Sequence, residues 1–435
     1  MLPQSNVMIT AEVVPERLQS LRQLLASMNE APGLADPHNE LIPFYQFEQL
    51  HFARFVIVES DVSEDLHAYS LEPRPWPPTL ALLADFDGSR ETFLAELAVR
   101  AGPGLAKIFA HCEGFEESEK SLLSWMLPRN IRPAANYINY LGRTVRQVRQ
   151  EKALHASLRQ RLSELTASES FSKPESLLES LRAHTDSQLA AGSLELSPAP
   201  KTPLRWRLAN LCHLLLPPLV LILLAPVLIL LLPFFFIALR IHERRDPEIV
   251  PRPDPDKVNS LAGLEDQIVS NQFSAFGDVK PGLFRRYTLI VLLFALDYAA
   301  RHIYRRGYLT RVQSIHFARW VLLDDKRRLL FASNYDGSLE SYMDDFINKV
   351  AWGLNLVFSN GIGYPRTRWL IKDGAEQEQK FKNYLRRHQV YTDVWYKAYP
   401  DATAFELKRN TRIRKGLESG GFRNSQAIRA WLALI

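Results

Sequence analysis

The chain has 435 residues, of which 46% are hydrophobic and 11% aromatic, which is enough for two or three domains with substantial cores. Its net charge is +5, and no Lys and Arg run interleaved with aromatic residues indicates a nucleic-acid groove, so we expect no nucleic-acid partner and a better fit to an anionic membrane surface. The two cysteines, Cys112 and Cys212, exclude a disulfide framework and a cysteine-based zinc or iron-sulfur site.

The first predicted half, residues 1–163, alternates strand-like and helix-like compositions and ends in a C-terminal helix. It predicts a strand over residues 7–14, a helix over 16–28, strands over 51–59 and 79–85, and a helix that Ser89 opens and that runs to about residue 99. This β-α-β-β-α order is that of a ferredoxin-like unit. The first residues, MLPQSN, lack the basic start and apolar core of a signal peptide, so we expect this half on the cytoplasmic face of a membrane.

A membrane segment follows. Residues 164–203 are rich in Ser, Glu and Ala and predict a flexible polar linker. In the next segment, 204–245, residues 214–239 read LLLPPLVLILLAPVLILLLPFFFIAL. Because about 20 apolar residues are enough to span a hydrocarbon core, this segment predicts that the lipid bilayer is a partner.

Two arrangements of the membrane segment remain open. Prolines interrupt its helical hydrogen bonds, and arginines at both ends give no preferred orientation. We expect a short helical hairpin that turns near Ala225-Pro226, because two halves that pack together must share one side of the membrane. The alternative is a single Pro-kinked transmembrane helix with the halves on opposite sides. The helix breakers are Pro217, Pro218, Pro226 and Pro233.

After a Pro-rich linker over residues 246–264, which predicts a stiff extended spacer, the second half, 265–435, repeats the first. The sequence IHFARWV at 315–321 repeats LHFARFV at 50–56, and SNYDGS at 333–338 repeats ADFDGS at 84–89. The repeat predicts strands over 272–279, 316–323 and 328–333, helices over 281–304 and 338–357, and C-terminal helices. The apolar run at 288–296 is too short to cross a membrane and predicts a buried helix.

Two ferredoxin-like units in one chain, each with Asp-Gly at a strand-to-helix turn, resemble the dimeric α+β barrel superfamily, and within it the dye-decolourising peroxidases. The resemblance implies an α+β fold in which two tandem ferredoxin-like halves form a pseudo-dimeric barrel, here with an inserted hydrophobic membrane segment. It also implies a haem cofactor, a distal Asp from a GxxDG motif, a neighbouring Arg and an axial His. In this chain Ala84 or Ser333 replaces the first glycine of that motif.

This resemblance implies roles for three residues. Asp336 would shuttle a proton of a peroxide substrate, Arg319 would stabilise the negative charge as the O–O bond breaks, and His316 would bind the cofactor; no metal site beyond haem is expected. The alternative for Asp336 is a turn residue before a helix cap. Arg319 would then need a buried carboxylate, for which Asp336 is a candidate, and His316 would be a hydrogen-bonded core residue.

His316 and Arg319 lie three residues apart on one strand, so they point to opposite faces unless a bulge intervenes. Arg319 would share its face with Phe317 and Val321, and His316 with Ala318 and Trp320. Two functions therefore stand as hypotheses: a membrane-associated, haem-dependent, peroxidase-like oxidoreductase with a small-molecule or peroxide substrate, or a non-catalytic membrane-bound module that binds a lipid or a protein. The sequence does not indicate an oligomeric state.

Overall fold

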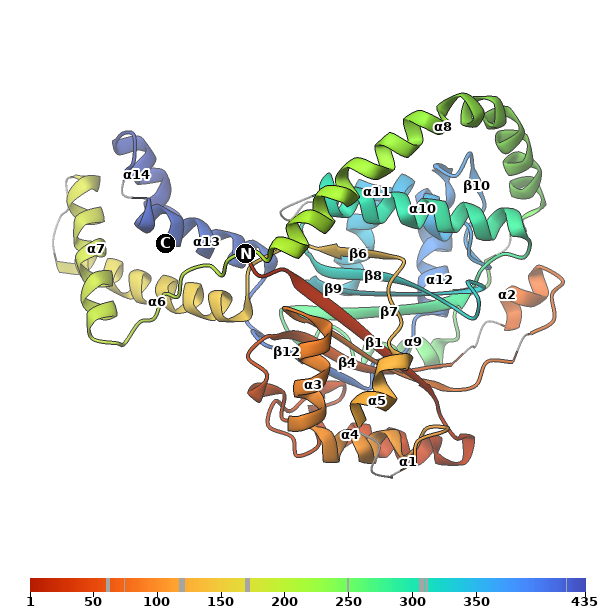
Figure 1. Ribbon diagram of the computed structural model, residues 1–435, viewed down its shortest axis with the longest axis horizontal. Helices are drawn as coiled ribbons and strands as arrows, with labels where there is room; N and C mark the ends of the chain where they lie inside the picture. Colours follow the sequence, from red (N-terminus) through yellow and green to blue (C-terminus); the bar gives the residue numbers. More distant parts are fainter. Residues whose placement is uncertain are drawn as a thin grey trace.

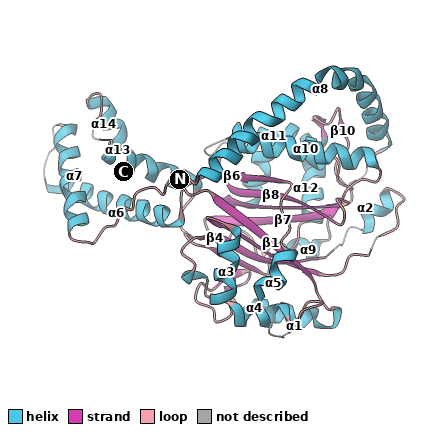
Figure 2. Cartoon of the chain, in the orientation of Figure 1, coloured by secondary structure: helices cyan, strands magenta, loops and turns pink. Residues whose placement is uncertain are grey.

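The computed structural model describes residues 1–59, 63–73, 75–116, 122–168, 173–248, 250–304, 309, 312–419 and 421–435. Within them the protein is α+β, with two large sheets, helices on the outside of each sheet, a helical lobe at one end and one long apolar helix (Figures 1 and 2). The expected α+β class is confirmed.

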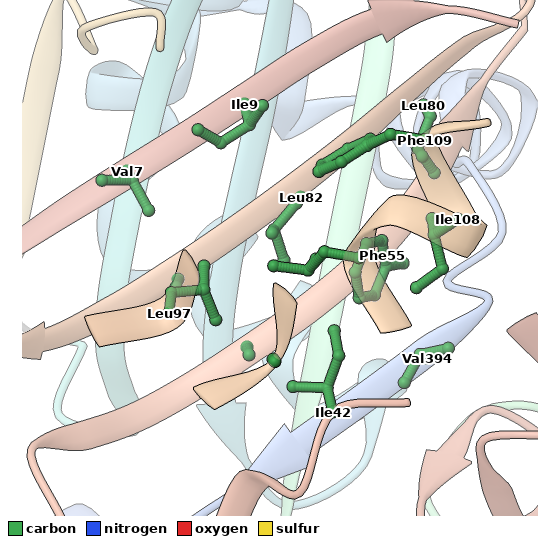
Figure 3. Close-up of a cluster of buried hydrophobic side chains, with 14 of the residues drawn as sticks. Val7, Ile9, Ile42, Phe55, Leu80, Leu82, Leu97, Ile108, Phe109 and Val394 are labelled. Carbon is green, nitrogen blue, oxygen red and sulfur yellow. The ribbon is translucent and has the colours of Figure 1, made fainter. Parts of the chain in front are cut away.

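The first sheet has the strand order β1-β5-β4-β12-β3-β2. Its strands are β1 (Gln4–Glu12), β2 (Asn29–Ala31), β3 (Leu34–Ala35), β4 (Leu50–Val58), β5 (Thr79–Asp87) and β12 (Val394–Lys397). Its outer face is covered by α1 (Leu18–Ala26), α3 (Arg90–Arg100), α4 (Gly102–Phe109) and α5 (Leu122–Met126). Figure 3 shows the core between them, where Phe55 and Leu82 of the sheet pack with Leu97 and Ile108 of the helices.

The second sheet has the order β6-β8-β9-β7. Its strands are β6 (Ala135–Ile138), β7 (Ser270–Asp278), β8 (Ile315–Leu323) and β9 (Arg328–Asp336). Its outer face packs on α10 (Leu283–His302), α11 (Leu339–Phe358) and α12 (Glu378–His388). Shorter elements are α2 (Ser63–Ala68), α9 (Pro255–Ala262), the hairpin β10 (Thr367–Arg368) and β11 (Lys372–Asp373), and 3-10 turns at Pro15–Arg17, Phe44–Gln46, Leu127–Arg129 and Gly374–Glu376.

Each sheet receives one strand from the other part of the chain. β12 pairs antiparallel with β4, with Val394 opposite Phe55, and β6 pairs antiparallel with β8, with Ala135 opposite Trp320. Val394 is part of the core of the first sheet in Figure 3. The two parts of the chain are therefore joined by backbone hydrogen bonds as well as by side chains.

The inner faces of the two sheets pack against each other. One buried cluster contains Val56 and Leu83 from the first sheet together with Val321, Leu330 and Ala332 from the second. All nine residues of β4 are buried, because one face of the strand meets helices and the other meets the second sheet. The two sheets therefore share a core between their inner faces.

The repeated Asp-Gly-Ser segments end β5 and β9 and begin helices, as the sequence predicts. Gly88 and Gly337 have φ of 92° and 85°, a backbone conformation that favours glycine. The Ser89 hydroxyl accepts a hydrogen bond of 3.1 Å from the Thr92 N–H, and the Ser338 hydroxyl accepts one of 3.2 Å from the Ser341 N–H. Both serines are helix caps.

The linker expectations need correction. The segment expected to be flexible contains α7 (Pro174–Ala190), which packs in a helical lobe with α6 (Val145–Ser168), α13 (Ala404–Glu418) and α14 (Ser425–Leu432). The expected extended spacer contains α9, and its first residue, Asp246, is buried and bonded to Lys280 and Arg285. Local composition does not predict these two features, because the leucines along α7 and the carboxylate of Asp246 contact residues in distant segments of the chain. Residues 169–172 and 249 of these linkers lie outside the described residues.

In the membrane segment, one continuous helix replaces the two short helices expected for a hairpin. The segment forms one helix, α8 (Leu204–Arg245), 42 residues long with all four prolines inside it. It is long and apolar enough to cross a membrane and is the one helix of this kind among the described residues. Figure 1 shows it as an arch over α10 and α11. The prolines bend the helix without reversing it.

Candidate functional site

Arg319 lies between the two sheets, with its guanidinium group directed at the first sheet. It donates to the Val7 carbonyl at 2.7 Å and to the Ala84 carbonyl at 3.2 Å, and it forms a buried ion pair with Asp85. The expected pairing with Asp336 is wrong, because Asp336 lies at the end of the sheet while Arg319 crosses the interface. A structural ion pair therefore accounts for Arg319, with a partner from the other part of the chain.

Arg54 occupies the corresponding position on β4 and reaches the second sheet. It donates to the Phe273 and Ser333 carbonyls at 3.0 and 2.8 Å and to the Asn334 side-chain oxygen. Asn334 stands where the first copy has Asp85, so Arg54 lacks the carboxylate that Arg319 has. Burial, together with the nearby positive charge of Arg319, lowers the pKa of Arg54 to about 9.

A bulge decides where His316 points. The register of β8 against β9 shifts between Ile315 and Phe317, and β4 has the same shift between Leu50 and Phe52. The His316 ring therefore lies 5.5 Å from the Phe52 ring of the opposite sheet, whereas Ala318 and Trp320 belong to the core beneath the helices. The expectation that His316 shares a face with them is wrong, while Phe317 and Val321 lie in the clusters between the sheets, as expected.

The two histidines belong to one chain of buried hydrogen bonds that joins the two repeats. His51 Nε2 contacts Asp87 at 3.0 Å and its Nδ1 contacts the Tyr399 hydroxyl at 2.8 Å. In the other repeat His316 Nε2 contacts Asp336 at 2.6 Å and its Nδ1 contacts the Tyr140 hydroxyl at 3.1 Å. The hydroxyls of Tyr140 and Tyr399 contact each other, so the chain is continuous from Asp87 to Asp336.

Each terminal carboxylate also caps a helix of the lobe. Asp87 accepts a 2.8 Å hydrogen bond from the Val145 N–H at the start of α6, and Asp336 accepts a 2.7 Å bond from the Ala404 N–H at the start of α13. Burial alone would raise the pKa of Asp336, but His316, Ser270 and the Ala404 N–H bring it below the usual value. A carboxylate at a helix N-terminus is stabilised by the helix dipole, which gives both Asp-Gly motifs a structural role.

The contacts of this hydrogen-bonded network determine how many protons it contains. Five contacts link Asp87, His51, Tyr399, Tyr140, His316 and Asp336. Each contact needs one proton, while two neutral imidazoles and two phenols supply four when both carboxylates are ionised. The fully bonded chain therefore holds one extra proton, shared between two repeats. Burial lowers the pKa of His316, with Lys397 and His51 acting in the same direction and Asp336 opposing them.

The side chains between the sheets do not fit a haem. Both ring nitrogens of His316 are engaged, Nδ1 by Tyr140 and Nε2 by Asp336 and Ser270. The space around Arg54 and Arg319 has a cavity volume near 0 Å³. A second cavity, between β7, β9 and the helices α11 and α12, measures about 20 Å³, roughly the room for one water molecule.

Sequence reasoning missed Asp85, Tyr140 and Tyr399. The matching of residues 135–140 with residues 394–399 aligns the two tyrosines, and Asp85 lies inside the repeated ADFDGS segment. The alignment of the two tyrosines could have identified them as candidates. Their contact with each other could not be predicted from the sequence, because it depends on each repeat donating a strand to the opposite sheet.

The second candidate surface is the middle of α8. Six consecutive residues, 219–224, are each at least 48% exposed. Six residues cover more than one and a half helical turns, so this stretch has no packed face. All six are Leu, Val or Ile, and apolar patches of this size mark contact with a membrane or another partner.

Both ends of α8 are fixed to the body of the protein. Near its start, His213 contacts His302 of α10 at 2.8 Å, and the Tyr298 hydroxyl donates to the Leu214 carbonyl at 3.0 Å. That carbonyl is the one that Pro218 leaves without its helical donor. Near the end of α8, the His242 ring stacks on Phe284, with centroids 4.8 Å apart.

A buried carboxylate fixes the end of α8 more firmly. Glu243 is fully buried and accepts hydrogen bonds from the Trp369 N–H at 3.0 Å and the Leu370 N–H at 2.8 Å. Trp369 and Leu370 form the turn of the β10–β11 hairpin with φ near 60°, a strained conformation for residues other than glycine. Glu243 therefore holds both the helix and the turn.

These anchors force α8 to bow. Phe284 of α10 contacts both Phe235 and His242 of α8, and His302 contacts His213. Between these anchors α10 spans 18 residues (302 − 284) and α8 spans 22 residues (235 − 213). At about 1.5 Å per residue these lengths are about 27 Å and about 33 Å. The helix therefore bows at most about 9 Å from the line joining its anchors, roughly a third of a hydrocarbon core about 30 Å thick.

No protein-family model, curated protein or solved structure matches this chain.

Proposed function

We propose that this chain is a non-catalytic, membrane-bound module that holds its two-sheet body against one face of a bilayer, with the arch of α8 inserted in the near leaflet. The observation that carries this proposal is that the middle of α8 is apolar and exposed on all sides, while side chains near both of its ends contact α10. A helix whose two ends rest on one body has both ends on one side of the membrane. A single span, with the halves on opposite sides, does not fit these anchors.

The basic residues at the base of the arch support the cytoplasmic face. Arg205 and Arg207 precede the apolar run, and Arg240, Arg244 and Arg245 follow it. Because the arch begins and ends on one side, these charges all face the same leaflet. Each basic residue near an anionic surface contributes about 1 kcal/mol of attraction. The cytoplasmic leaflet is the one that carries the anionic lipids.

We also propose that the body is a pseudo-dimeric α+β barrel of two ferredoxin-like halves. Its support is the equivalence of strand positions: β1, β5, β4 and β12 are hydrogen-bonded in the same order as β7, β9, β8 and β6. The exchanged strands have equivalent registers, Trp395 opposite Arg54 and Asn136 opposite Arg319. Such a body offers a rigid platform for a lipid or protein partner.

Flotation on vesicles tests membrane binding. The full-length protein should float with vesicles that contain anionic lipid, and binding should weaken at high salt because surface charges are screened. The double variant Leu223→Asp with Ile229→Asp should remain in the dense fraction. Val99→Asp is the matched control, because Val99 is an exposed apolar residue on α3, away from the arch. A wild-type protein that stays in the dense fraction contradicts the proposal.

Sidedness has its own test. Lys201 and Glu248 are exposed and flank the two ends of α8. In reconstituted vesicles, cysteines replacing them should react equally with an impermeant thiol reagent added from one side. Reaction of only one of the two would establish a single span.

The haem-dependent peroxidase remains a prediction of the family resemblance, and the engaged nitrogens of His316 do not favour it. An absorption spectrum of the purified protein after haem supplementation tests it. A Soret band that is lost in His316→Ala would support the peroxidase over the binding module.

A further inference from the structure

The outer face of α10 carries an apolar stripe that its own fold leaves uncovered. Leu283, Tyr287, Val291 and Phe294 are 51–65% exposed. Their spacing of four, four and three residues places them on one side of the helix. Leu289 and Leu293 on the other side are buried against the second sheet. The expectation of a buried helix here is thus met by one face only.

This stripe points toward the arch. At about 100° per residue, the α10 residues that contact α8 lie with Tyr287, Val291 and Phe294 within one arc of about 140°. The contacting residues are Phe284, Phe294, Asp297, Tyr298, Arg301 and His302. The arch therefore stands over the stripe and contacts it only near its two ends.

Between these end contacts, two exposed apolar surfaces face each other. Packed helices lie 8–10 Å apart, and the bow of α8 increases this separation by at most about 9 Å at its middle. Contacts at both ends keep the surfaces apart, among them the bond of Tyr298 to Leu214 and the stacking of His242 on Phe284. Water between two such surfaces is unfavourable, so the space requires an apolar occupant that is flexible and thin.

Aromatic and basic residues at both bases of the arch mark the depth at which it enters a bilayer. The guanidinium of Arg301 lies 5.7 Å from the Trp206 ring at one base, and that of Arg240 lies 5.0 Å from the Trp369 ring at the other. Trp and Arg are the residues that sit at the headgroup level of membranes. If the bases of the arch lie at the headgroup level, the arch itself and the stripe beneath it lie in the hydrocarbon core or at its boundary.

We propose that acyl chains of the near leaflet fill the space between α8 and α10, so that the α10 stripe is a lipid-binding surface in its own right. This inference rests on the proposed membrane binding and adds a specific lipid contact to it. The occupant is a bilayer lipid because the basic and aromatic residues frame the opening at both ends.

The test places a probe on the stripe. Val291→Cys, labelled with bimane in a protein whose exposed Cys212 is replaced by Ser, is bound to vesicles whose lipids carry bromine on the acyl chains, which quenches fluorescence on contact. We expect strong quenching at position 291 and none for the matched control Val99→Cys. Separately, Val291→Asp should weaken vesicle binding at least about tenfold, because a charge there enters the apolar region, and Val291→Leu should bind like the wild type.

The outcomes separate the two proposals. If the wild type does not bind vesicles, the proposed membrane function fails. If it binds while position 291 is quenched no more than position 99, the membrane function stands and the stripe is not a lipid site. A stable dimer in sedimentation that shields position 291 from brominated lipid would assign the stripe to a second copy and overturn the inference. Since Val291 is exposed, unchanged thermal unfolding of each variant checks that the fold is intact.

Discussion

At the scale of single residues, the interface between the sheets is asymmetric in charge although its backbone is repeated. Two guanidinium groups enter it, from Arg54 and Arg319, but one carboxylate, Asp85, balances them directly. The counterpart of Asp85 is the neutral Asn334. A buried charge without a counterion is costly, so the two arginines differ in what their removal leaves behind.

Replacing each arginine by Ala should therefore have unequal effects. Arg319→Ala leaves the Asp85 carboxylate buried and unpaired, which costs about 3 to 5 kcal/mol. Arg54→Ala leaves neutral acceptors and should cost about 1 to 3 kcal/mol. Chemical unfolding of the detergent-solubilised protein measures both. Equal midpoints for Arg319→Ala and the wild type would exclude the ion pair as a source of stability.

A second prediction concerns the hydrogen-bonded network of buried histidines and tyrosines. Tyr399→Phe removes two of the five contacts and leaves three, which His51, Tyr140 and His316 satisfy without an extra proton. Nitrogen NMR shifts at pH 7 should show one protonated imidazole within this chain in the wild type and none in the variant. Neutral imidazoles in both proteins would refute the proton count.

The buried Lys397 makes the stability of the fold depend on pH, in a direction that follows from its pKa. Burial lowers its pKa from 10.5 to about 7, with Asp336, Asp401 and Glu406 opposing the shift and Lys152 adding to it. Between pH 7 and pH 10.5 the unfolded chain holds a proton that the folded chain has lost, so this residue makes stability rise with pH. The rise approaches about 1.4 kcal/mol per pH unit. Unfolding of Lys397→Met across this range should lack that contribution, and parallel pH profiles would contradict it.

At the scale of elements, α8 is shaped by its prolines and by the groups that complete its hydrogen bonds. Pro226 and Pro233 lie seven residues apart, on the same helix face, so their kinks bend the helix in one direction. Pro226 also lies near the midpoint between the anchors at His213 and His242. The arch thus follows from the sequence of α8 together with the length of α10.

The Glu243 anchor can be tested directly. Glu243→Ala leaves the Trp369 and Leu370 N–H groups buried without acceptors and should destabilise the protein by about 2 kcal/mol or more. Hydrogen exchange of residues 367–373 should accelerate. Glu248→Ala is the control, because Glu248 is largely exposed in its ion pair with Arg366 and such pairs contribute about 0 to 1 kcal/mol. Unaltered exchange in Glu243→Ala would show that the turn holds itself.

At the scale of the whole molecule, strand exchange couples the two parts of the chain. Without β12 the edge of β4 is open, and without β6 the edge of β8 is open. An exposed edge of a buried strand promotes aggregation. The parts are therefore expected to fold together, with the interface between the sheets as a shared core.

Separate expression tests this coupling. Residues 1–200 alone and residues 201–435 alone should aggregate, whereas co-expression of the two pieces should yield a complex that copurifies, because each supplies the missing strand of the other. The uncut chain serves as the reference for thermal unfolding. Two pieces that are each soluble and cooperatively folded would show that the exchanged strands are dispensable.

The sequence by itself determined the elements and their order. Alternating apolar residues, the repeated Asp-Gly-Ser turns and the serine caps act within a few residues, so the strands β4, β5, β8 and β9 and the starts of α3 and α11 were predicted within about three residues. The apolar composition of α8 likewise identified a helix long and apolar enough to cross a membrane without any tertiary information.

The tertiary structure alone decided which residues meet. A bulge of one residue turned His316 to the interface, strand exchange brought Tyr140 to Tyr399, and the opposing sheet supplied Asp85 to Arg319. The shape of α8 depended on the positions of His302 and Phe284 on another helix. These contacts join residues far apart in the chain, and local patterns carry no information about such distances, because they are fixed only when the two sheets pack.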